Sequence, residues 1–251
     1  MTLDIITADS LSPLRHGFFT RRGGASSGVF AGLNCGQGSS DQSEVVRINR
    51  HRVAEAVGVA PDALITAHQV HSADVAVIDA PPKTRPQADA MATATPGLAL
   101  AVLTADCAPV LFADHESGVI GAAHAGWRGA RDGVLEATID AMEGLGAARG
   151  DIHAVIGPTI SQPAYEVGPE FLEEFLADDP DNHRFFVGGA KGRYHFDLPV
   201  YGLHRMRAAG IGVAEWTRHC TYSDPGRFFS YRRATHAGEA DYGRLISVIR
   251  L

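Results

Sequence analysis

Short apolar runs recur along the whole chain, separated by turn-forming and charged residues. The longest of them, Gly97 to Leu103, has the length of a strand and falls far short of the roughly 20 residues that a membrane-spanning helix needs. Several runs lack a strict alternation of polar and apolar residues, which is typical of strands buried on both faces. The chain is therefore expected to fold around buried sheets. We do not expect it to bind or span a membrane.

Nine of these runs are predicted as strands. They are His16–Thr20, Leu64–His68, Val75–Ile78, Leu98–Thr104, Val110–Ala113, Val119–His124, Ile152–Ile156, Val213–Trp216 and Leu245–Ile249. The break Asp114–Gly118 between two runs predicts a hairpin, and therefore some antiparallel pairing. Helices between the other strands imply layers of helix on sheet.

Four helices are predicted from apolar spacing and end signals. The first starts near Asp41 and ends at Val57. The other three cover Ala130–Leu145, Glu170–Leu176 and Val200–Ala209. Asp41 and Glu44 have the spacing of a capping box, and Gly58 is the expected left-handed end of the first helix. The expected fold class is a mixed α/β or α+β protein, with mixed sheets packed between helices, in a single domain over residues 1–251.

Charge and cysteine usage narrow the class of partner. The 251 residues carry 22 basic and 29 acidic side chains, a net charge of −7, so no fold-wide basic footprint for nucleic acid is present. The first ten residues contain no basic region followed by an apolar stretch, unlike a secretory signal. Three cysteines without a CxxC spacing argue against a disulfide framework and lead us to expect a cytoplasmic location.

Three segments that follow predicted strands combine metal-binding side chains with tight turns. They are Thr66–Ser72, Thr104–Pro109 and Ala122–Gly129. Their histidines and the thiol of Cys107 form a suitable ligand set for zinc, and three protein ligands leave a fourth position open. The alternative is that His68 or His71 is a hydrogen-bonded polar residue and Cys107 a small core residue.

Other polar residues are candidates for ligand binding. Arg128 stands between two glycines just before a predicted helix, so that its guanidinium and the free amides of the helix could bind an anion. Asn34 and Arg50 are of the kind that orient a ligand, although Arg50 could equally belong to a solvated helix face. Zinc nucleobase deaminases of the common kind are excluded, since neither H-x-E nor P-C-x-x-C occurs.

Several motifs resemble those of one family. The sequence contains HQVHS, TADCAPVLF, GAAHAGWRG, IGPTISQPAYEVG and FFSYRR, and an earlier block, RRGGASSG, precedes them. In this order they resemble the YfiH or laccase-domain family, over nearly the whole chain. The resemblance implies a layered single domain, similar in fold to cysteine-dependent toxin deamidases, with one zinc ion held by His71, Cys107 and His124.

The same resemblance implies the activity. Members were once described as polyphenol oxidases or laccases, are now associated with phosphorolysis of purine nucleosides and with adenosine deamination, and in some bacteria are described as peptidoglycan editing factors. We therefore expect a zinc-dependent purine nucleoside enzyme, with a nucleoside and phosphate as its small-molecule partners. His68 or Asp106 would move the proton, and Arg128 would neutralise the phosphate.

Two other activities remain open at this point. Cys107, activated by His124 or His71, could be the nucleophile of an amide hydrolase that acts on cell-wall precursors. Copper-dependent phenol oxidation is less well supported, because none of the 12 histidines stands two residues from another and laccase-type sites use such pairs. A zinc ion with a purely structural role is a further alternative.

Overall fold

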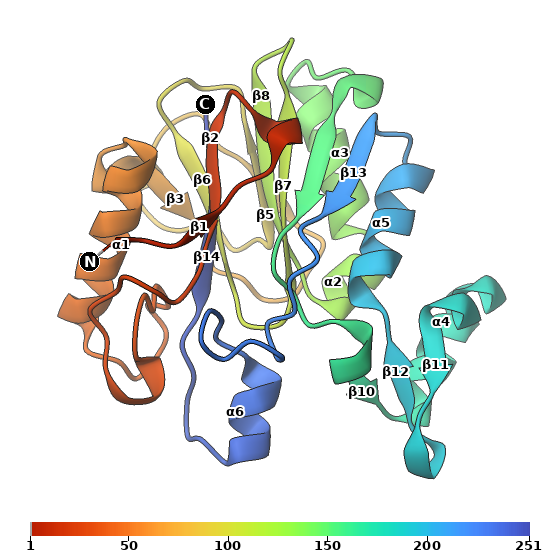
Figure 1. Cartoon of the computed structure of the whole chain (residues 1–251). Helices are drawn as coiled ribbons and strands as arrows, with labels where there is room; N and C mark the ends of the chain where they lie inside the picture. The colour runs from red at the N-terminus through yellow and green to blue at the C-terminus, as the bar shows by residue number, and fades with distance from the viewer. Residues whose placement is uncertain (1) are drawn as a thin grey trace.

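The computed structural model describes residues 2–251. Within them the strands form three sheets, with the orders β1-β2-β14-β6-β3, β13-β9-β7-β8-β5-β4 and β10-β12-β11. Both larger sheets contain parallel as well as antiparallel pairs: β3–β6 and β14–β6 in the five-stranded sheet, and β4–β5 and β7–β8 in the six-stranded one. The mixed α+β class expected from the sequence is therefore confirmed (Figure 1).

The elements have the following bounds. The strands are β1 (Ile5–Ile6), β2 (Arg15–Phe19), β3 (Leu64–Thr66), β4 (Val75–Val77), β5 (Ala90–Thr93), β6 (Ala99–Thr104), β7 (Ala108–Asp114), β8 (Val119–Ala125), β9 (His153–Ile156), β10 (Glu166–Val167), β11 (Phe186–Gly188), β12 (Tyr194–Phe196), β13 (Val213–Trp216) and β14 (Leu245–Arg250). The helices are α1 (Ser43–Val57), α2 (Trp127–Asp132), α3 (Val134–Gly144), α4 (Pro169–Asp178), α5 (Leu198–Ala208) and α6 (Tyr231–Ala237).

The two larger sheets pack face to face between outer helices. Leu100 and Val102 of β6 point to a core shared with Leu111 of β7 in the other sheet. The alternate residues of β6, Ala99 and Ala101, pack with the apolar side of α1. On the far side of the six-stranded sheet the core is closed by α3 and α5. The order helix, sheet, sheet, helix buries both faces of the central strands (Figure 1).

All nine predicted strands are present, and the predicted hairpin joins β7 to β8 in antiparallel register. Strand β5 was not predicted, because its sequence, AMAT, contains only one of the β-branched and aromatic residues that indicate a strand. Strands β1, β10, β11 and β12 have only two or three residues each, too few for a periodic pattern.

The predicted capping box at the start of α1 is wrong. The N-cap is Gln42, without a side-chain cap, and α1 begins at Ser43. The carboxylate of Asp41 instead accepts hydrogen bonds from Ser26 Oγ and Asn34 Nδ2, at 2.7 and 3.0 Å. These tertiary hydrogen bonds replace the local one that the spacing predicted. The end of α1 at Gly58, with φ of 74°, is as expected.

The single helix predicted over Ala130–Leu145 is also wrong, because the chain forms α2 and α3 with a break at Gly133. Gly133 has φ of 99°, in the left-handed region that glycine adopts without steric cost. The six residues of α2 precede this break and α3 follows it, and both helices contribute buried residues to the core on this side of the six-stranded sheet. The break therefore separates the HAGWRG segment from the helix that covers the six-stranded sheet.

We expect Gly133→Ala to lower the free energy of unfolding by about 1–2 kcal/mol, the cost of a left-handed L-residue. A Cβ atom at this position would lie 3.8 Å from its nearest neighbours, so the cost is conformational and not steric. Gly144→Ala is the matched control, because Gly144 is helical and its Cβ would meet no atom within 4 Å. Denaturant unfolding measures both; equal stability of the two variants would contradict the argument.

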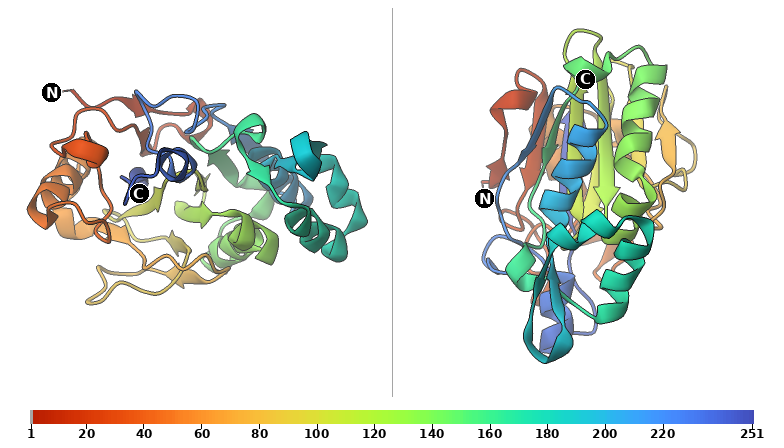
Figure 2. Two further views of the ribbon diagram at one scale, coloured as in Figure 1. Left: turned by 90° about the horizontal axis from the view of Figure 1, so that it is seen from below. Right: turned by 90° about the vertical axis from the view of Figure 1, so that its right-hand side faces the viewer.

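The chain segments that carry the predicted ligands meet at one end of the layers. Cys107 directly precedes β7, His124 is the penultimate residue of β8, and His71 lies in the connection from β3 to β4. Seen from below in Figure 2, α6 lies near the middle of this end, with α1 on one side and α4 on the other. In the part of the chain that the structure describes, no helix is both long and apolar enough to cross a bilayer.

Candidate metal centre and adjoining cavities

His71, Cys107 and His124 form one compact cluster. Their ligand atoms all lie within 4.8 Å of one another, and Cys107 Sγ lies 3.8 Å from His71 Nε2. The rings of the two histidines meet edge to face, with centroids 4.7 Å apart. His71 is exposed, Cys107 is half-buried and His124 is buried, so the cluster opens toward solvent on one side.

A carboxylate orients the buried histidine. Asp89 is fully buried, and its Oδ1 atom lies 2.8 Å from His124 Nδ1. This contact leaves Nε2 of His124 free to bind a metal, because a ligating histidine commonly donates its other ring N–H to a carboxylate. Burial opposes ionisation of Asp89, but donors led by His124, Ser72 and Val70 hold the pKa of its carboxyl well below the usual range.

The same carboxylate shapes the loop that carries His71. Backbone N–H groups of Val70, His71 and Ser72 donate to Asp89, at distances of 2.9, 2.9 and 2.7 Å. His71 has φ of 63°, an unusual conformation for a residue other than glycine. The three hydrogen bonds stabilise this turn, so Asp89 positions two of the three candidate ligands at once.

Asp106 has a comparable role beside Cys107. Its φ is 87°, and its carboxylate accepts hydrogen bonds from Thr221 Oγ1, Ser230 Oγ and the backbone N–H of Arg232, at 2.6, 2.9 and 2.7 Å. Ser230 is also the N-cap of α6. Asp106 therefore connects the turn before Cys107 to α6. The sequence suggested that this carboxylate transfers a proton, but in the structure it already accepts three hydrogen bonds.

The electrostatics of the cluster favour a thiolate beside an imidazolium. Burial raises the pKa of the Cys107 thiol, but the interactions with His124 and His71 lower this pKa by more than burial raises it. The net shift is therefore downward. Burial lowers the pKa of His124, whereas Cys107 and Asp89 raise it, and the net shift is upward. The thiolate is the form of Cys107 that binds a metal or attacks an electrophile, whereas the His124 imidazolium must release its Nε2 proton before it can bind a metal.

The geometry of the cluster fits one transition-metal ion. Tetrahedral zinc with bonds of about 2.0–2.3 Å requires its ligand atoms to lie about 3.5 Å apart. The 3.8 Å between Cys107 Sγ and His71 Nε2 is close to that separation, and the hydrogen bond that His124 Nδ1 donates to Asp89 fixes the tautomer of His124. As ligands of such an ion, the three side chains would leave its exposed side open, as in catalytic rather than structural zinc sites.

Two cavities meet at this cluster. The first, which we call the aromatic cavity, has a volume of about 420 Å³ and is walled by Trp127, Tyr165, Phe171 and Tyr231. Arg232 lies over the ring of Tyr165 at 5.3 Å and donates to the carbonyl of Glu166. The cavity includes His71 and Cys107 in its lining, so a bound planar molecule would touch the candidate metal ligands.

The second, which we call the glycine-loop cavity, has a volume of about 660 Å³ and contains His71, Cys107 and His124 in its wall. The loop Gly36–Gly38 and the side chain of Arg85 form its other side. His71 and Cys107 therefore line both cavities, and the candidate metal centre lies at their junction.

The other residues singled out from the sequence are placed differently. His68 lies in the wall of the glycine-loop cavity, near the cluster. Arg128 is exposed, lies over Trp127 at 5.0 Å and lines neither cavity. Asn34 is fully buried, and its amide donates to Ser39 and Asp41 while its oxygen accepts from backbone amides.

Sequence reasoning missed Asp89, Tyr231 and Arg85. The signal for Asp89 was a lone acidic residue in an otherwise apolar run, Ala88 to Ala92, which forms most of a buried strand and the two residues before it. A carboxylate in such a run needs several donors, so its presence indicates a network. Tyr231 lies in the FFSYRR motif, so the sequence marked its segment but assigned it no role at the site. Arg85 had no comparable signal, because it is an exposed residue of a loop.

The fold and the site together define a layered α+β protein with a His-Cys-His cluster between two cavities. Residues 15–251 match the family described as multi-copper polyphenol oxidoreductase laccase, and the chain belongs to this family. It is the family that the sequence motifs resemble. Among solved structures, protein NMB0706 of Neisseria meningitidis, a DUF152 protein, superimposes with a TM-score of 0.89 and 36% identity, covering 98% of both chains.

Further relatives agree with this assignment. YfiH of Bacillus licheniformis superimposes with a TM-score of 0.87 at 30% identity, covering 94% of this chain and 92% of that one. A protein of Deinococcus radiodurans named purine nucleoside phosphorylase is 41% identical over 249 residues, which are 99% of this chain and 93% of the relative. A protein of Pseudomonas aeruginosa with the same type of name is 40% identical over 220 residues, 87% of this chain and 88% of the relative.

Proposed function

We propose that this protein is a zinc-dependent purine nucleoside phosphorylase that also deaminates adenosine. The observation that carries the proposal is the convergence of His71, Cys107 and His124 at the junction of an aromatic cavity and a polar one. The names of the Deinococcus and Pseudomonas relatives support the reaction class.

The three ligands would hold a zinc ion, with Asp89 orienting His124 and the turn at His71. Zinc in such an open site supplies a Lewis acid that can activate water at neutral pH. The aromatic cavity suits a purine, because Tyr165, Phe171 and Trp127 offer ring faces on which a base can stack. For phosphorolysis the ribose would lie toward His71 and Cys107, whereas for deamination the purine would have to present C6 to them.

In phosphorolysis, a phosphate oxygen forms a bond to C1′ of the ribose while the bond from C1′ to the purine nitrogen breaks. The purine leaves with the electron pair and must receive a proton. In deamination, a water oxygen forms a bond to C6 and the amino group leaves as ammonia. We assign the proton transfer to His68, which lines the glycine-loop cavity with the ligands, rather than to Asp106, whose carboxylate already has three donors.

The alternative of an amide hydrolase rests on the Cys107 thiol. Its pKa is lowered by His124 and His71, as in enzymes that use a thiolate nucleophile. The thiol would attack a carbonyl carbon of a cell-wall peptide, and the amine would leave with a proton from a histidine. Such an enzyme would survive metal chelation and would be inactivated by alkylation.

The purified protein tests the proposal directly. We expect about one zinc per chain, formation of adenine and ribose 1-phosphate from adenosine with phosphate, and inosine without it. Elemental analysis measures the metal, and mass spectrometry of the products measures both reactions. A chelator should abolish turnover, and added zinc should restore it. Zinc without nucleoside turnover would favour the amide hydrolase, and copper would return attention to phenol oxidation.

A further inference from the structure

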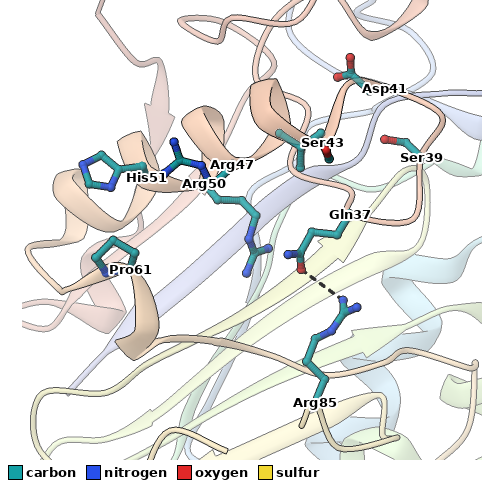
Figure 3. Close-up of a pocket in the computed structure, with 10 residues that line it drawn as sticks. Gln37, Ser39, Asp41, Ser43, Arg47, Arg50, His51, Pro61 and Arg85 are labelled. Carbon is teal, nitrogen blue, oxygen red and sulfur yellow. Dashed lines mark hydrogen bonds between the residues drawn. The ribbon is translucent and has the colours of Figure 1, made fainter. Parts of the chain in front are cut away.

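A third cavity lies beside the glycine-loop cavity, between α1 and the loop that carries Arg85. We call it the arginine cavity; its volume is about 510 Å³. Figure 3 shows the guanidinium groups of Arg50 and Arg85 directed into the same space, with the amide of Gln37 between them. Gln37 and Arg85 also line the glycine-loop cavity, so the arginine cavity adjoins the one that contains the candidate metal ligands.

Arg50 holds a charge without a counter-ion. Its Nη1 atom is buried and has no hydrogen-bond partner, and its Nη2 atom donates only to Thr66 Oγ1 at 3.2 Å. Burial raises the pKa of the neighbouring Cys35 thiol to about 12, so Cys35 is neutral and supplies no negative charge. Leaving a buried cation without a partner is costly, and proteins normally pair it.

Arg85 adds a second positive charge. Its Nη1 atom donates to Gln37 Oε1 at 3.2 Å, a neutral acceptor. Among residues 2–251, no carboxylate lies within ion-pair distance of either Arg50 or Arg85. Two guanidinium groups that face one space without an anion repel each other, and an anion between them would relieve that repulsion.

The acidic residues near the cavity are already engaged. Asp41 accepts hydrogen bonds from Ser26, Asn34 and the backbone of Gln42. Glu44 pairs with Arg47 at 2.6 Å on the exposed side of α1. The charge of Arg50 and Arg85 is therefore available to a ligand.

We propose that the arginine cavity binds a phosphate oxyanion through Arg50, Arg85 and Gln37. Forked guanidinium donors match the oxygens of a tetrahedral anion, and Gln37 can turn its N–H₂ toward it. The oxyanion is either free inorganic phosphate or the phosphoryl group of a nucleotide. Its role as the phosphate of phosphorolysis rests on the proposed function; its existence as a binding site does not. The assignment replaces Arg128, which the sequence had suggested for this role.

Calorimetric titration of the zinc-loaded wild type with inorganic phosphate, without nucleoside, tests the site. We expect binding, weakened about 10- to 100-fold in Arg50→Gln and in Arg85→Gln, as for the loss of a charge-assisted hydrogen bond. Arg128→Gln should keep the affinity of the wild type. Metal content and melting temperature should not fall in Arg85→Gln, since this side chain is exposed.

A second titration with adenosine 5′-monophosphate separates the two sources. If only the nucleotide binds, and both cavity variants lose it, the site takes a phosphoryl group. If neither ligand binds the wild type, or if Arg128→Gln loses phosphate while the two cavity variants retain it, the proposal is overturned. If phosphate binds here but adenosine is not phosphorolysed, the proposed function fails and this site stands.

Discussion

Replacing Cys107 with serine is expected to lower the metal content from about one ion per chain to near zero and nucleoside turnover at least 1000-fold, because catalytic zinc has only three protein ligands. A serine hydroxyl is a much weaker ligand than a thiolate, and His71 and His124 alone would leave two protein ligands. Elemental analysis after gel filtration measures the metal, and phosphate-dependent release of adenine measures the activity.

Cys220→Ser is the matched control. Cys220 is also a half-buried thiol, and it accepts hydrogen bonds from Ser161 and Ser223 that a serine hydroxyl can accept as well. This variant should keep both metal and activity. If Cys107→Ser retained its zinc but lost activity, the thiol would be a nucleophile rather than a ligand, and the amide hydrolase would become the better explanation.

The strands were predictable because their physical cause is local. Leu100 and Val102 face one core and Ala99 and Ala101 face another, so the run between Leu98 and Thr104 needs to be apolar at every position. Elements of two or three residues, such as β10, carry no such pattern. The small sheet of β10, β12 and β11 packs through contacts between separate elements, such as that of Phe175 in α4 with Phe196 in β12, which no local pattern contains.

The candidate site was predictable to a smaller extent. Metal-binding side chains at strand ends pointed to His71, Cys107 and His124, whose clustering the structure now gives. Arg128 illustrates the limit: the sequence placed it before one long helix, whereas in the structure it lies on six-residue α2, over Trp127, and lines neither cavity. Which polar residues face a cavity depends on tertiary packing, and a sequence motif alone does not contain that information.

Replacing Asp89 with asparagine is expected to weaken zinc affinity about 10- to 100-fold, the usual effect of losing the carboxylate that orients a histidine ligand. The same change should lower the free energy of unfolding by about 2–4 kcal/mol, since a buried network loses its charge and one acceptor. Asparagine has one oxygen, so its N–H₂ group must face either His124 or the amides of Val70 and Ser72. Zinc competition with a chelator and denaturant unfolding of the metal-free protein measure the two effects.

Asp114→Asn separates these effects. Asp114 is also buried and accepts hydrogen bonds from three backbone N–H groups, those of Glu116, Ser117 and Ala148. It lies at the other end of β7 from Cys107, about 20 Å along the strand. We expect it to lose stability without losing zinc affinity. Equal zinc affinities of Asp89→Asn and the wild type would show that the ligands hold their positions without the carboxylate. The contact between Asp89 and His124 would then stabilise the fold but would not position the metal.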